Sequence, residues 1–463
     1  MKSDYMFNKQ RTAGTLVLWL MIVLAGTGCY TKKSQEEETA PEPKSESAAP
    51  AATGAEATEA PPAATPPSAK AKVDVDLYLE VSNGMKGFMP PPAADKKPTV
   101  FQSRLNKLLS EVEDGIYVDS KRYYLAKEDG QGQPVLESVS YGTLKNTITS
   151  GIKADVRGTP LPAMLQAALA NSIKGGAVSV IVSDFIHGPD PNNPGQFLSL
   201  DSDIRSSLKQ AEHKNLVVAV LADASPFYGS YYPAVKKPAT KQNLTGQEVP
   251  FYTWVIGPQA EVQTVINKVL RNLPAQQAYF GFSYGAVPYS AILKAKAFKP
   301  QGVVYCTSRT AQVCTSVNLI PEKGAPVAFD IALDLSQLPA SMQEAAYLKK
   351  HLQLTVTGGK AAIGTVVAAT PDTRAVPELA TYTHFVRVTV TQVTAATGTL
   401  TVQLPSVVPA WIPQWSTQND NNPAAAPRKT YQLQKIVEGL QALYRDKSEQ
   451  VFTATIKFNK ETN

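Results

Sequence analysis

Hydrophobic residues in the first half of the folded chain occur either in short continuous runs or at helical spacing. The runs at residues 76–81, 177–182 and 216–221 predict buried strands, because strands covered on both faces are apolar at almost every position. Residues 101–112 and 160–172 repeat apolar side chains three and four positions apart, which predicts helices. This alternation favours a doubly wound α/β sheet, whose ligands lie beyond the carboxyl ends of its strands.

The pattern changes at about residue 291 to strands that alternate or run apolar, with turn residues between them. It predicts a mostly-β, sandwich-like domain, in which each strand buries one face. An amphipathic helix is expected near the C-terminus, at residues 430–444. The strands are expected at residues 303–305, 327–335, 352–357, 385–390, 398–404 and 451–458.

Residues 1–28 have the composition of a signal peptide. A basic head precedes an apolar run at residues 16–25, which is too short to span a bilayer and indicates export. The run leads into Gly26, Thr27, Gly28 and Cys29, which resemble the lipobox of bacterial lipoproteins, with Gly26 where that motif usually has Leu. The resemblance implies that Cys29 is lipidated and becomes the new N-terminus. The alternative is an ordinary signal peptide beside an unrelated cysteine.

Residues 29–72 are expected to form a disordered tether. The segment 30–72 contains 12 Ala and 7 Pro and lacks Val, Ile, Leu, Met, Phe and Trp, so it cannot bury enough apolar area to fold. Tyr30 behind the cysteine resembles lipoproteins that Gram-negative bacteria send to the outer membrane. The acidic cluster at residues 35–38 also resembles the surface-export signal of Bacteroidetes lipoproteins. The expected location is therefore the cell envelope, in the outer membrane.

Charge and composition narrow the class of protein further. The 463 residues carry a formal net charge of +6 and no long Lys/Arg block, which argues against a nucleic-acid partner. Three cysteines and four histidines are too few for a disulfide scaffold or a Cys/His-rich metal centre. What remains is a globular protein with an export signal.

Three loops at predicted strand ends carry a recognisable set of oxygen-bearing residues. The first runs from Glu80 through Ser82 and Gly84 to the sequence Met-Lys-Gly-Phe, the second holds Thr159, and the third holds Asp184. In this order they resemble the metal-ion-dependent adhesion site of von Willebrand factor A domains, which reads Asp-x-Ser-x-Ser, then Thr, then Asp. The resemblance covers about residues 73–275 and implies that family's α/β fold.

The same resemblance implies roles for the individual residues. Ser82 and Thr159 would be direct metal ligands, and Asp184 would act through a water molecule. Glu80 stands where the family has Asp, and Gly84 stands where it has the second Ser, so one hydroxyl ligand is missing. Magnesium needs six oxygens in near-octahedral order, so we expect no certain cofactor and at most a weak Mg, Ca or Mn site. The simpler interpretation is turn chemistry at Ser82 and helix capping at Thr159.

Aromatic residues gather just beyond the predicted strand at residues 216–221. Phe227, Tyr228, Tyr231 and Tyr232 lie in one short segment at the edge that carries the three loops, which makes them a candidate surface for a protein partner. The alternative is a loop that packs on its own side chains.

Two cysteines and one serine motif remain in the second half of the chain. Cys306 and Cys314 are eight residues apart, so a short hairpin could bring them together as a disulfide in an exported chain; two free thiols are the alternative. Ser283 lies in a Gly-x-Ser-x-Gly sequence, which is typical of serine hydrolases when a strand-to-helix turn presents the serine. Asp330 or Asp334 with His351 or His384 would complete a triad. The motif follows an expected helix rather than a strand, which argues against that assignment.

The predicted organisation is a signal peptide at residues 1–28, a tether at 29–72, a von Willebrand factor A-like domain at 73–290 and a sandwich-like domain with a C-terminal helix at 291–463. The favoured function is a membrane-anchored, non-enzymatic binding or scaffold protein that docks a protein partner at the strand-end edge. The alternative is an exported serine hydrolase that uses Ser283.

Overall fold

The computed structural model describes most of the chain from residue 72 onward. The described ranges are 72–92, 97–153, 155–156, 160–187, 198–235, 241–271, 275–308, 310, 312–321, 325–444 and 449–461. Cys29, the expected tether and Thr159 therefore lie outside the described residues. No helix in the described ranges is long and apolar enough to cross a membrane.

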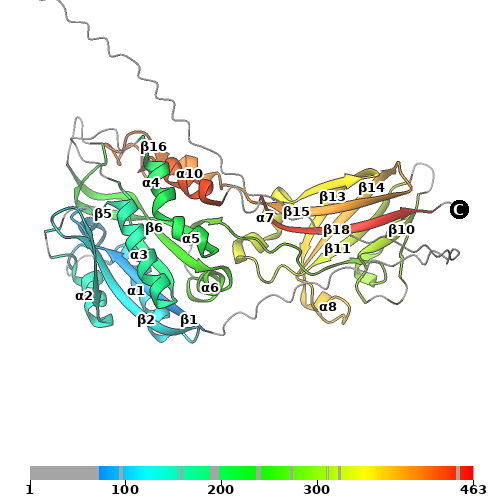
Figure 1. The fold of residues 1–463 in the computed structure, drawn as a ribbon, viewed down its shortest axis with the longest axis horizontal. Helices are drawn as coiled ribbons and strands as arrows, with labels where there is room; N and C mark the ends of the chain where they lie inside the picture. The colour runs from blue at the N-terminus through cyan, green and yellow to red at the C-terminus, as the bar shows by residue number, and fades with distance from the viewer. Residues whose placement is uncertain are drawn as a thin grey trace, which may run out of the picture. The chain divides into compact units, whose positions relative to one another are not determined.

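The first half of the described chain forms a seven-stranded mixed sheet, in the order β3-β2-β1-β4-β6-β5-β7 (Figure 1). Strand β1 is parallel to both of its neighbours, and every other pairing in the sheet is antiparallel. The strands are β1 (Val73–Glu80), β2 (Val118–Glu128), β3 (Pro134–Val139), β4 (Val178–Ser183), β5 (Leu216–Tyr231), β6 (Gln242–Pro258) and β7 (Gln276–Phe280).

The sheet departs from an all-parallel arrangement because β5 and β6 form one long hairpin. The two strands pair antiparallel from Leu216 opposite Pro258 to Tyr231 opposite Gln242. Antiparallel pairing is the arrangement that a short connection allows, and it places β6 between β4 and β5. The α/β class is confirmed, and the parallel order expected for a doubly wound sheet holds only around β1.

Helices cover both faces of this sheet. Phe101 and Leu105 of α1 pack with Leu77 and Val180 in the hydrophobic cluster on one face. Leu165 of α3 belongs to a second hydrophobic cluster, on the opposite face. The helices of this half are α1 (Val100–Asp114), α2 (Tyr141–Ser150), α3 (Leu161–Gly175), α4 (Leu200–Ser207), α5 (Lys209–His213) and α6 (Gln259–Thr264). The short turns η1 (Met85–Phe88) and η3 (Val265–Val269) follow β1 and α6.

The C-terminal helix α10 (Leu433–Tyr444) shares its core with the seven-stranded sheet. Ile436 and Leu440 are fully buried in the cluster that contains Trp254 of β6, and α10 lies beside α4 (Figure 1). The backbone of Gly439 contacts Asp201, where an added Cβ would lie 2.3 Å from the Asp201 carbonyl oxygen. The sequence-based boundary at residue 290 assigned this helix to the second domain, whereas its apolar face completes the first.

The β-rich region contains a five-stranded sheet, β12-β15-β18-β10-β9, and a four-stranded sheet, β13-β14-β11-β8. Buried residues of both sheets, such as Phe329 and Leu400, belong to one hydrophobic cluster. The strands are β8 (Tyr289–Ile292), β9 (Val303–Cys306), β10 (Ser316–Ile320), β11 (Val327–Leu333), β12 (Gln353–Thr357), β13 (Gly359–Ala368), β14 (His384–Val393), β15 (Thr397–Pro405) and β18 (Gln450–Lys460). The remaining elements are η4 (Lys296–Phe298), η5 (Ala340–Gln343), α7 (Ala345–His351), α8 (Pro371–Arg374), α9 (Trp411–Trp415), β16 (Ser416–Thr417) and β17 (Thr430–Tyr431).

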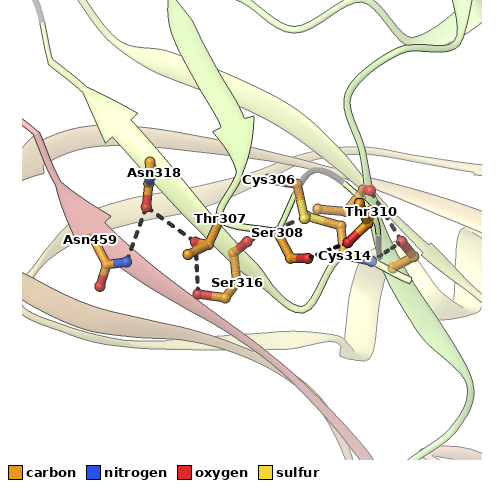
Figure 2. The surroundings of a disulfide bond; sticks show 10 residues. Cys306, Thr307, Ser308, Thr310, Cys314, Ser316, Asn318 and Asn459 are labelled. Atoms are coloured by element: carbon orange, nitrogen blue, oxygen red, sulfur yellow. Dashed lines mark hydrogen bonds between the residues drawn. A yellow bond between two sulfur atoms is a disulfide. The ribbon is translucent and has the colours of Figure 1, made fainter. Parts of the chain in front are cut away.

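The two cysteines of this region form the predicted disulfide (Figure 2). Cys306 ends β9, directly opposite Val317 of the antiparallel strand β10, and the Cα atoms of Cys306 and Cys314 are 5.8 Å apart. That separation is the usual one for a disulfide. The bond closes the connection between β9 and β10.

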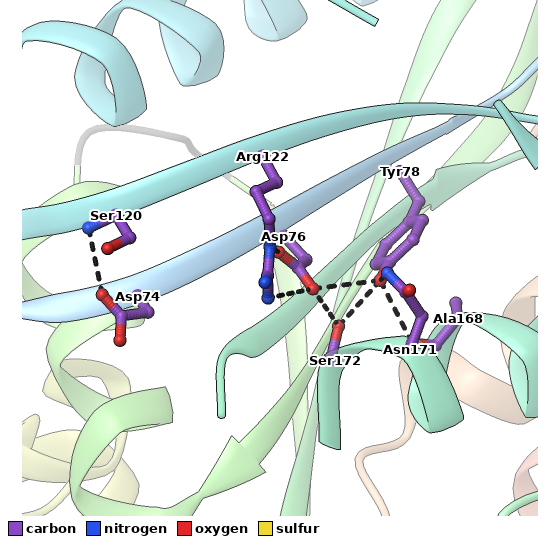
Figure 3. Close-up of polar contacts among 8 residues, drawn as sticks. All are labelled: Asp74, Asp76, Tyr78, Ser120, Arg122, Ala168, Asn171 and Ser172. Atoms are coloured by element: carbon purple, nitrogen blue, oxygen red, sulfur yellow. Dashed lines mark hydrogen bonds and ion pairs between the residues drawn. The ribbon is translucent and has the colours of Figure 1, made fainter. Parts of the chain in front are cut away.

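A buried polar network fixes β1 against β2 and α3 (Figure 3). The Asp76 carboxylate is fully buried, and Arg122 Nε and Nη2 donate to its two oxygens at 2.6 and 3.0 Å. Ser172 Oγ donates to Asp76 Oδ2 at 2.9 Å, and Asn171 Nδ2 donates to the Tyr78 hydroxyl at 2.8 Å. Burial raises the pKa of Tyr78, so the hydroxyl stays a donor. The network holds the strand whose far end carries Glu80.

Candidate functional site

Two acidic residues meet at the carboxyl ends of the parallel strands β1 and β4. Glu80 is the last residue of β1, and Asp184 follows Ser183 at the end of β4. Leu79 pairs with Val182, so the two ends are adjacent. Glu80 is only 6% exposed and Asp184 only 5%. Two carboxyl groups therefore lie in one buried environment, at the edge where the fold predicts a ligand site.

The hydroxyl of Ser183 connects the two strand ends. Its Oγ donates a hydrogen bond to Glu80 Oε2 and accepts one from the Phe185 backbone N–H at 2.9 Å. Ser82 accepts from the Met85 backbone N–H at 3.3 Å and also hydrogen-bonds to Glu80. Both serine hydroxyls therefore hydrogen-bond to the Glu80 carboxyl.

Burial dominates the acid–base behaviour of the pair. It raises the pKa of Glu80, against the opposing effect of hydrogen bonds from Ser183 and Ser82. Burial also raises the pKa of Asp184 well above its ordinary value, and the nearby charge of Glu80 adds to that rise. The hydrogen bond from the Ile186 backbone N–H acts in the opposite direction. Two buried carboxyls this close hold a proton more readily than isolated ones.

The turn after β4 is held in a strained conformation that aims Asp184. Phe185 has a positive φ of 55°, a conformation that costs a non-glycine residue about 1–3 kcal/mol. Its ring is buried and stacks on Trp254 with centroids 4.7 Å apart. Ile186 N–H donates to Asp184 Oδ1 at 2.9 Å, which leaves Oδ2 facing the first loop. The packing of Phe185 therefore maintains the position of the carboxylate.

The first loop brings Gly84 to the same point. A Cβ added at Gly84 would lie 3.4 Å from Ser82 Oγ and 3.5 Å from Asp184 Oδ2. The structure thus gathers Glu80, Ser82, Gly84 and Asp184, four of the positions that the motif selected. Thr159, the fifth, lies outside the described residues.

A further carboxylate, Asp420, was not predicted from the sequence. It is 3% exposed and accepts hydrogen bonds from the backbone N–H groups of Ala234 and Val235 at 2.7 and 3.1 Å. Its charge contributes to the raised pKa of Asp184. Its sequence context, between Asn419 and Asn421, indicates only a loop, and nothing local reveals that this loop returns to the hairpin of β5 and β6.

The aromatic segment is part of that hairpin rather than a free loop. Phe227 is fully buried and packs edge-on against Phe88 at 5.0 Å, and Tyr231, 2% exposed, packs against Phe227. Phe227 and Tyr231 are therefore part of the hydrophobic core, and their assignment to a contact surface was wrong. Tyr228, 37% exposed, and the half-buried Tyr232 remain at the surface.

Tyr228 and Tyr232 line a pocket of about 390 Å³, which Asn83 of the first loop also lines. Its other walls come from residues that follow β1 and α2: Asn83, Lys86, Met89, Pro90, Pro91, Gly151, Ile152 and Asp155. The volume lies within the range of small-ligand sites, about 300–1,000 Å³.

The described residues contain no group of three or more His, Cys, Asp or Glu side chains arranged to hold a metal ion. Ser82 Oγ and Asp184 Oδ2 lie 3.4 and 3.5 Å from a Cβ added at position 84, and magnesium requires six oxygens. A weak divalent site stays a prediction, and no step proposed below passes through a metal.

The Gly-x-Ser-x-Gly sequence does not form a nucleophile elbow. The motif directly follows strand β7 and not a helix, so that part of the sequence argument was wrong, but the chain continues to β8 without the helix that a nucleophile elbow requires. The proposed acid and base have other partners: His384 Nε2 is 2.6 Å from the Gln343 carbonyl oxygen, and Asp330 pairs with Arg387 at 2.6 Å. The backbone N–H of Ser283 donates to Gln259 Oε1 at 2.9 Å.

Comparison of the chain with known protein families, with curated proteins and with solved structures gives no match. The fold and site alone define a mixed α/β domain with a buried acid pair at its strand-end edge, followed by a β-rich region.

Proposed function

We propose that this chain is a membrane-anchored, non-enzymatic binding or scaffold protein that docks a protein partner through the strand-end edge of a von Willebrand factor A-like domain. The observation that carries the proposal is the convergence of Glu80, Ser82, Gly84 and Asp184 at the ends of β1 and β4. Residues from two of the three loops of the degenerate adhesion motif lie at one edge, which supports the proposal.

The same edge has two features that are common at docking surfaces. The pocket is lined by Asn83 of the first loop and by the exposed Tyr228. Tyrosine at the border of a pocket is typical of protein interfaces, where it supplies contact area at low conformational cost.

Site-specific photo-crosslinking tests the docking edge. A photoreactive phenylalanine analogue in place of Lys86, at the pocket rim, is expected to form a crosslinked adduct of defined mass in intact cells of the native host. The matched control replaces Lys349, an exposed lysine of α7 in the β-rich region. Absence of an adduct at position 86, or the same adduct from both positions, would contradict the proposal.

Anchoring is tested separately at Cys29. We propose that the protein is held at the outer membrane by a lipid on this cysteine, so Cys29→Ser should release it from membranes or leave it unprocessed. Metabolic labelling with an alkyne-tagged palmitate measures the modification directly, and an unlabelled wild-type protein would refute it. Cys306→Ser with Cys314→Ser is the control, since neither cysteine follows the export signal.

A further inference from the structure

Three lysines lie close together on the connection between β8 and β9. Lys294, Lys296 and Lys299 are all exposed, and we call them the lysine turn. In the part of the chain that the structure describes, none of the three forms an ion pair with a carboxylate. The surrounding sequence does not balance their charge, because residues 262–321 contain six Lys or Arg and no Asp or Glu.

The backbone of the lysine turn has one face on the protein and one face outward. Its centre, η4, is a 3-10 turn, in which side chains three positions apart lie on the same side. Ala295 and Phe298 form the inner side: Ala295 is 7% exposed, and Phe298 stacks on Phe385 with ring centroids 4.2 Å apart. Lys296 and Lys299, also three positions apart, therefore share the outer side.

A buried ion pair holds the turn without neutralising it. Arg387 Nη1 donates to the Lys299 carbonyl oxygen at 3.0 Å and to Asp330 Oδ2 at 2.6 Å. The Asp330 carboxylate is 6% exposed and is paired with Arg387, so it does not offset the lysines. Just beyond the turn, Gln301 and Ala328 exchange two backbone hydrogen bonds at 2.7 and 2.9 Å. The three ammonium groups therefore project from a fixed base.

The neighbouring charges leave this surface positive. The segment that contains α8 packs on the same hydrophobic cluster as the lysine turn. Its exposed charged residues carry one net negative charge: Asp372, Arg374 and Glu378. Since the lysine turn carries three positive charges, the two segments together keep a net charge of +2.

The chemistry of the lysine turn favours an extended anionic surface over a single bound anion. A lysine ammonium is a point charge on a flexible stem, whereas the rigid fork of arginine is better suited to hold one phosphate or carboxylate. An anionic bilayer attracts each nearby lysine separately, and each strengthens binding roughly fivefold. Three lysines on one side of a fixed turn match such a surface.

We infer that the lysine turn docks on the anionic phospholipid headgroups of the membrane that holds the protein. The inference rests on the anchoring in the proposed function, because a lipid on Cys29 would keep the turn at a high effective concentration near that membrane. It concerns a different surface from the partner-docking edge, so the two contacts are tested independently.

Fluorescence quenching in vesicles tests the inference. The full chain, with a fluorescent coumarin amino acid in place of the exposed Ala297, is mixed with vesicles that contain a lipid spin-labelled at its headgroup. Quenching is expected when phosphatidylglycerol is added to phosphatidylcholine vesicles, and not with phosphatidylcholine alone. It should disappear at about 1 M salt, where the Debye length is about 3 Å. No quenching with the anionic vesicles, or equal quenching in both, would overturn the inference.

A matched pair of triple variants assigns the contact to the lysine turn. Lys294→Gln with Lys296→Gln and Lys299→Gln should abolish the quenching. The control removes the same charge from other exposed lysines of the β-rich region and should leave the quenching unchanged: Lys349→Gln with Lys350→Gln and Lys360→Gln. Equal losses in the two triple variants would mean that net charge, not the turn, attracts the bilayer, and the inference would be wrong.

Co-sedimentation with the same vesicles separates this inference from the proposed anchoring. A chain that sediments with neutral and anionic vesicles alike, and is quenched in neither, is anchored without the lysine turn. A chain that sediments only with anionic vesicles, and is quenched there, has no anchor, so the proposed anchoring fails and the lysine turn stands. In that case the lysine-turn triple variant should bind roughly 100-fold more weakly.

Discussion

At the scale of single residues, the site is defined by what its carboxyl groups contact. Ser183 and Ser82 complete the hydrogen bonding of Glu80, and the Phe185 turn directs Asp184 Oδ2 toward position 84. In a metal-binding adhesion site the cation would neutralise the acidic residues. Here the described contacts hold them by hydroxyls, backbone N–H groups and burial. The acid–base behaviour of the pair is therefore the property most directly open to measurement.

Replacing Glu80 by Gln should make the protein more stable at alkaline pH. Because burial raises the pKa of Glu80 and of Asp184, the folded protein binds more protons than the unfolded one. The free energy of unfolding therefore falls as the pH rises from the unfolded pKa of about 4 through the higher folded values. Glu80→Gln removes one of these carboxyls, so its Tm at pH 8 should exceed that of the wild type by about 2–4 °C, equivalent to about 1 kcal/mol.

Thermal melts between pH 5 and pH 8 measure this effect. The wild type should lose stability across the range, and Glu80→Gln should lose less. Glu137→Gln, on the partly exposed strand β3, is the control and should follow the wild-type profile. Parallel profiles for Glu80→Gln and the wild type would show that the acid pair does not titrate in this way.

The double change Glu80→Asp with Gly84→Ser should strengthen divalent-cation binding at least tenfold, about 1.4 kcal/mol. A serine Cβ at position 84 would stand within 3.5 Å of both Ser82 Oγ and Asp184 Oδ2, which adds the missing hydroxyl. The backbone of Gly84 is right-handed, with φ −63°, so serine fits without strain. Titration calorimetry with magnesium measures both proteins, and the wild type should bind no tighter than about millimolar.

Gly142→Ser is the control for that experiment, since Gly142 lies on α2 away from the acid pair. Micromolar magnesium binding by the wild type would mean that the two departures from the motif cost nothing. An unchanged affinity in the double variant would mean that these loops do not form a cation site.

At the scale of elements, individual strands could be predicted from their own residues, whereas the pairing of strands that are distant in the sequence could not. The apolar runs at residues 76–81 and 177–182 correspond to β1 and β4, because a strand buried on both faces is evident from its own residues. The same holds for the loops that follow them, which contain Glu80, Ser82 and Asp184. The pairing of β5 with β6 could not be predicted in this way, because which strand lies next to β4 depends on the whole sheet. Asp420 reaches the site only through such long-range contacts.

The buried Asp76 network should stabilise the sheet far more than a surface ion pair does. Arg122→Leu would leave the fully buried Asp76 carboxylate without its cation, and breaking a buried pair costs about 3–5 kcal/mol. The Arg122 side chain is 41% exposed, so water can partly replace it. We therefore expect the free energy of unfolding to fall by about 3 kcal/mol, the lower end of that range.

Denaturation in urea measures the change, with Lys127→Leu as the matched control. Lys127 pairs with Glu137 on the neighbouring strands β2 and β3, and both side chains are substantially exposed. Exposed pairs contribute about 0–1 kcal/mol, so this variant should resemble the wild type. Equal effects of the two substitutions would refute the structural role assigned to Asp76.

At the scale of the molecule, the α/β domain is completed by residues that come late in the chain. Tyr444 of α10 donates to the Leu216 carbonyl oxygen at 2.9 Å, and the Trp411 indole N–H donates to the Gln277 carbonyl oxygen at 3.1 Å. Asp420 holds the backbone that follows β5. The first sheet and its helices are therefore a discontinuous domain: most of the β-rich region lies before its final helix, and β18 of that region follows the helix.

A chain limited to residues 73–290, the domain expected from the sequence, should consequently fail to fold. Without α10 the sheet face that contains Trp254 loses Ile436 and Leu440, both fully buried, and the site loses Asp420. The truncated chain should bind a hydrophobic dye and lack near-ultraviolet circular dichroism, as loosely packed states do. Addition of a peptide of residues 409–444 should restore the dichroism, whereas the same peptide with Leu440→Asp should not. A cooperative unfolding transition in the truncated chain alone would show that α10 is dispensable, and the domain boundary would then return to residue 290.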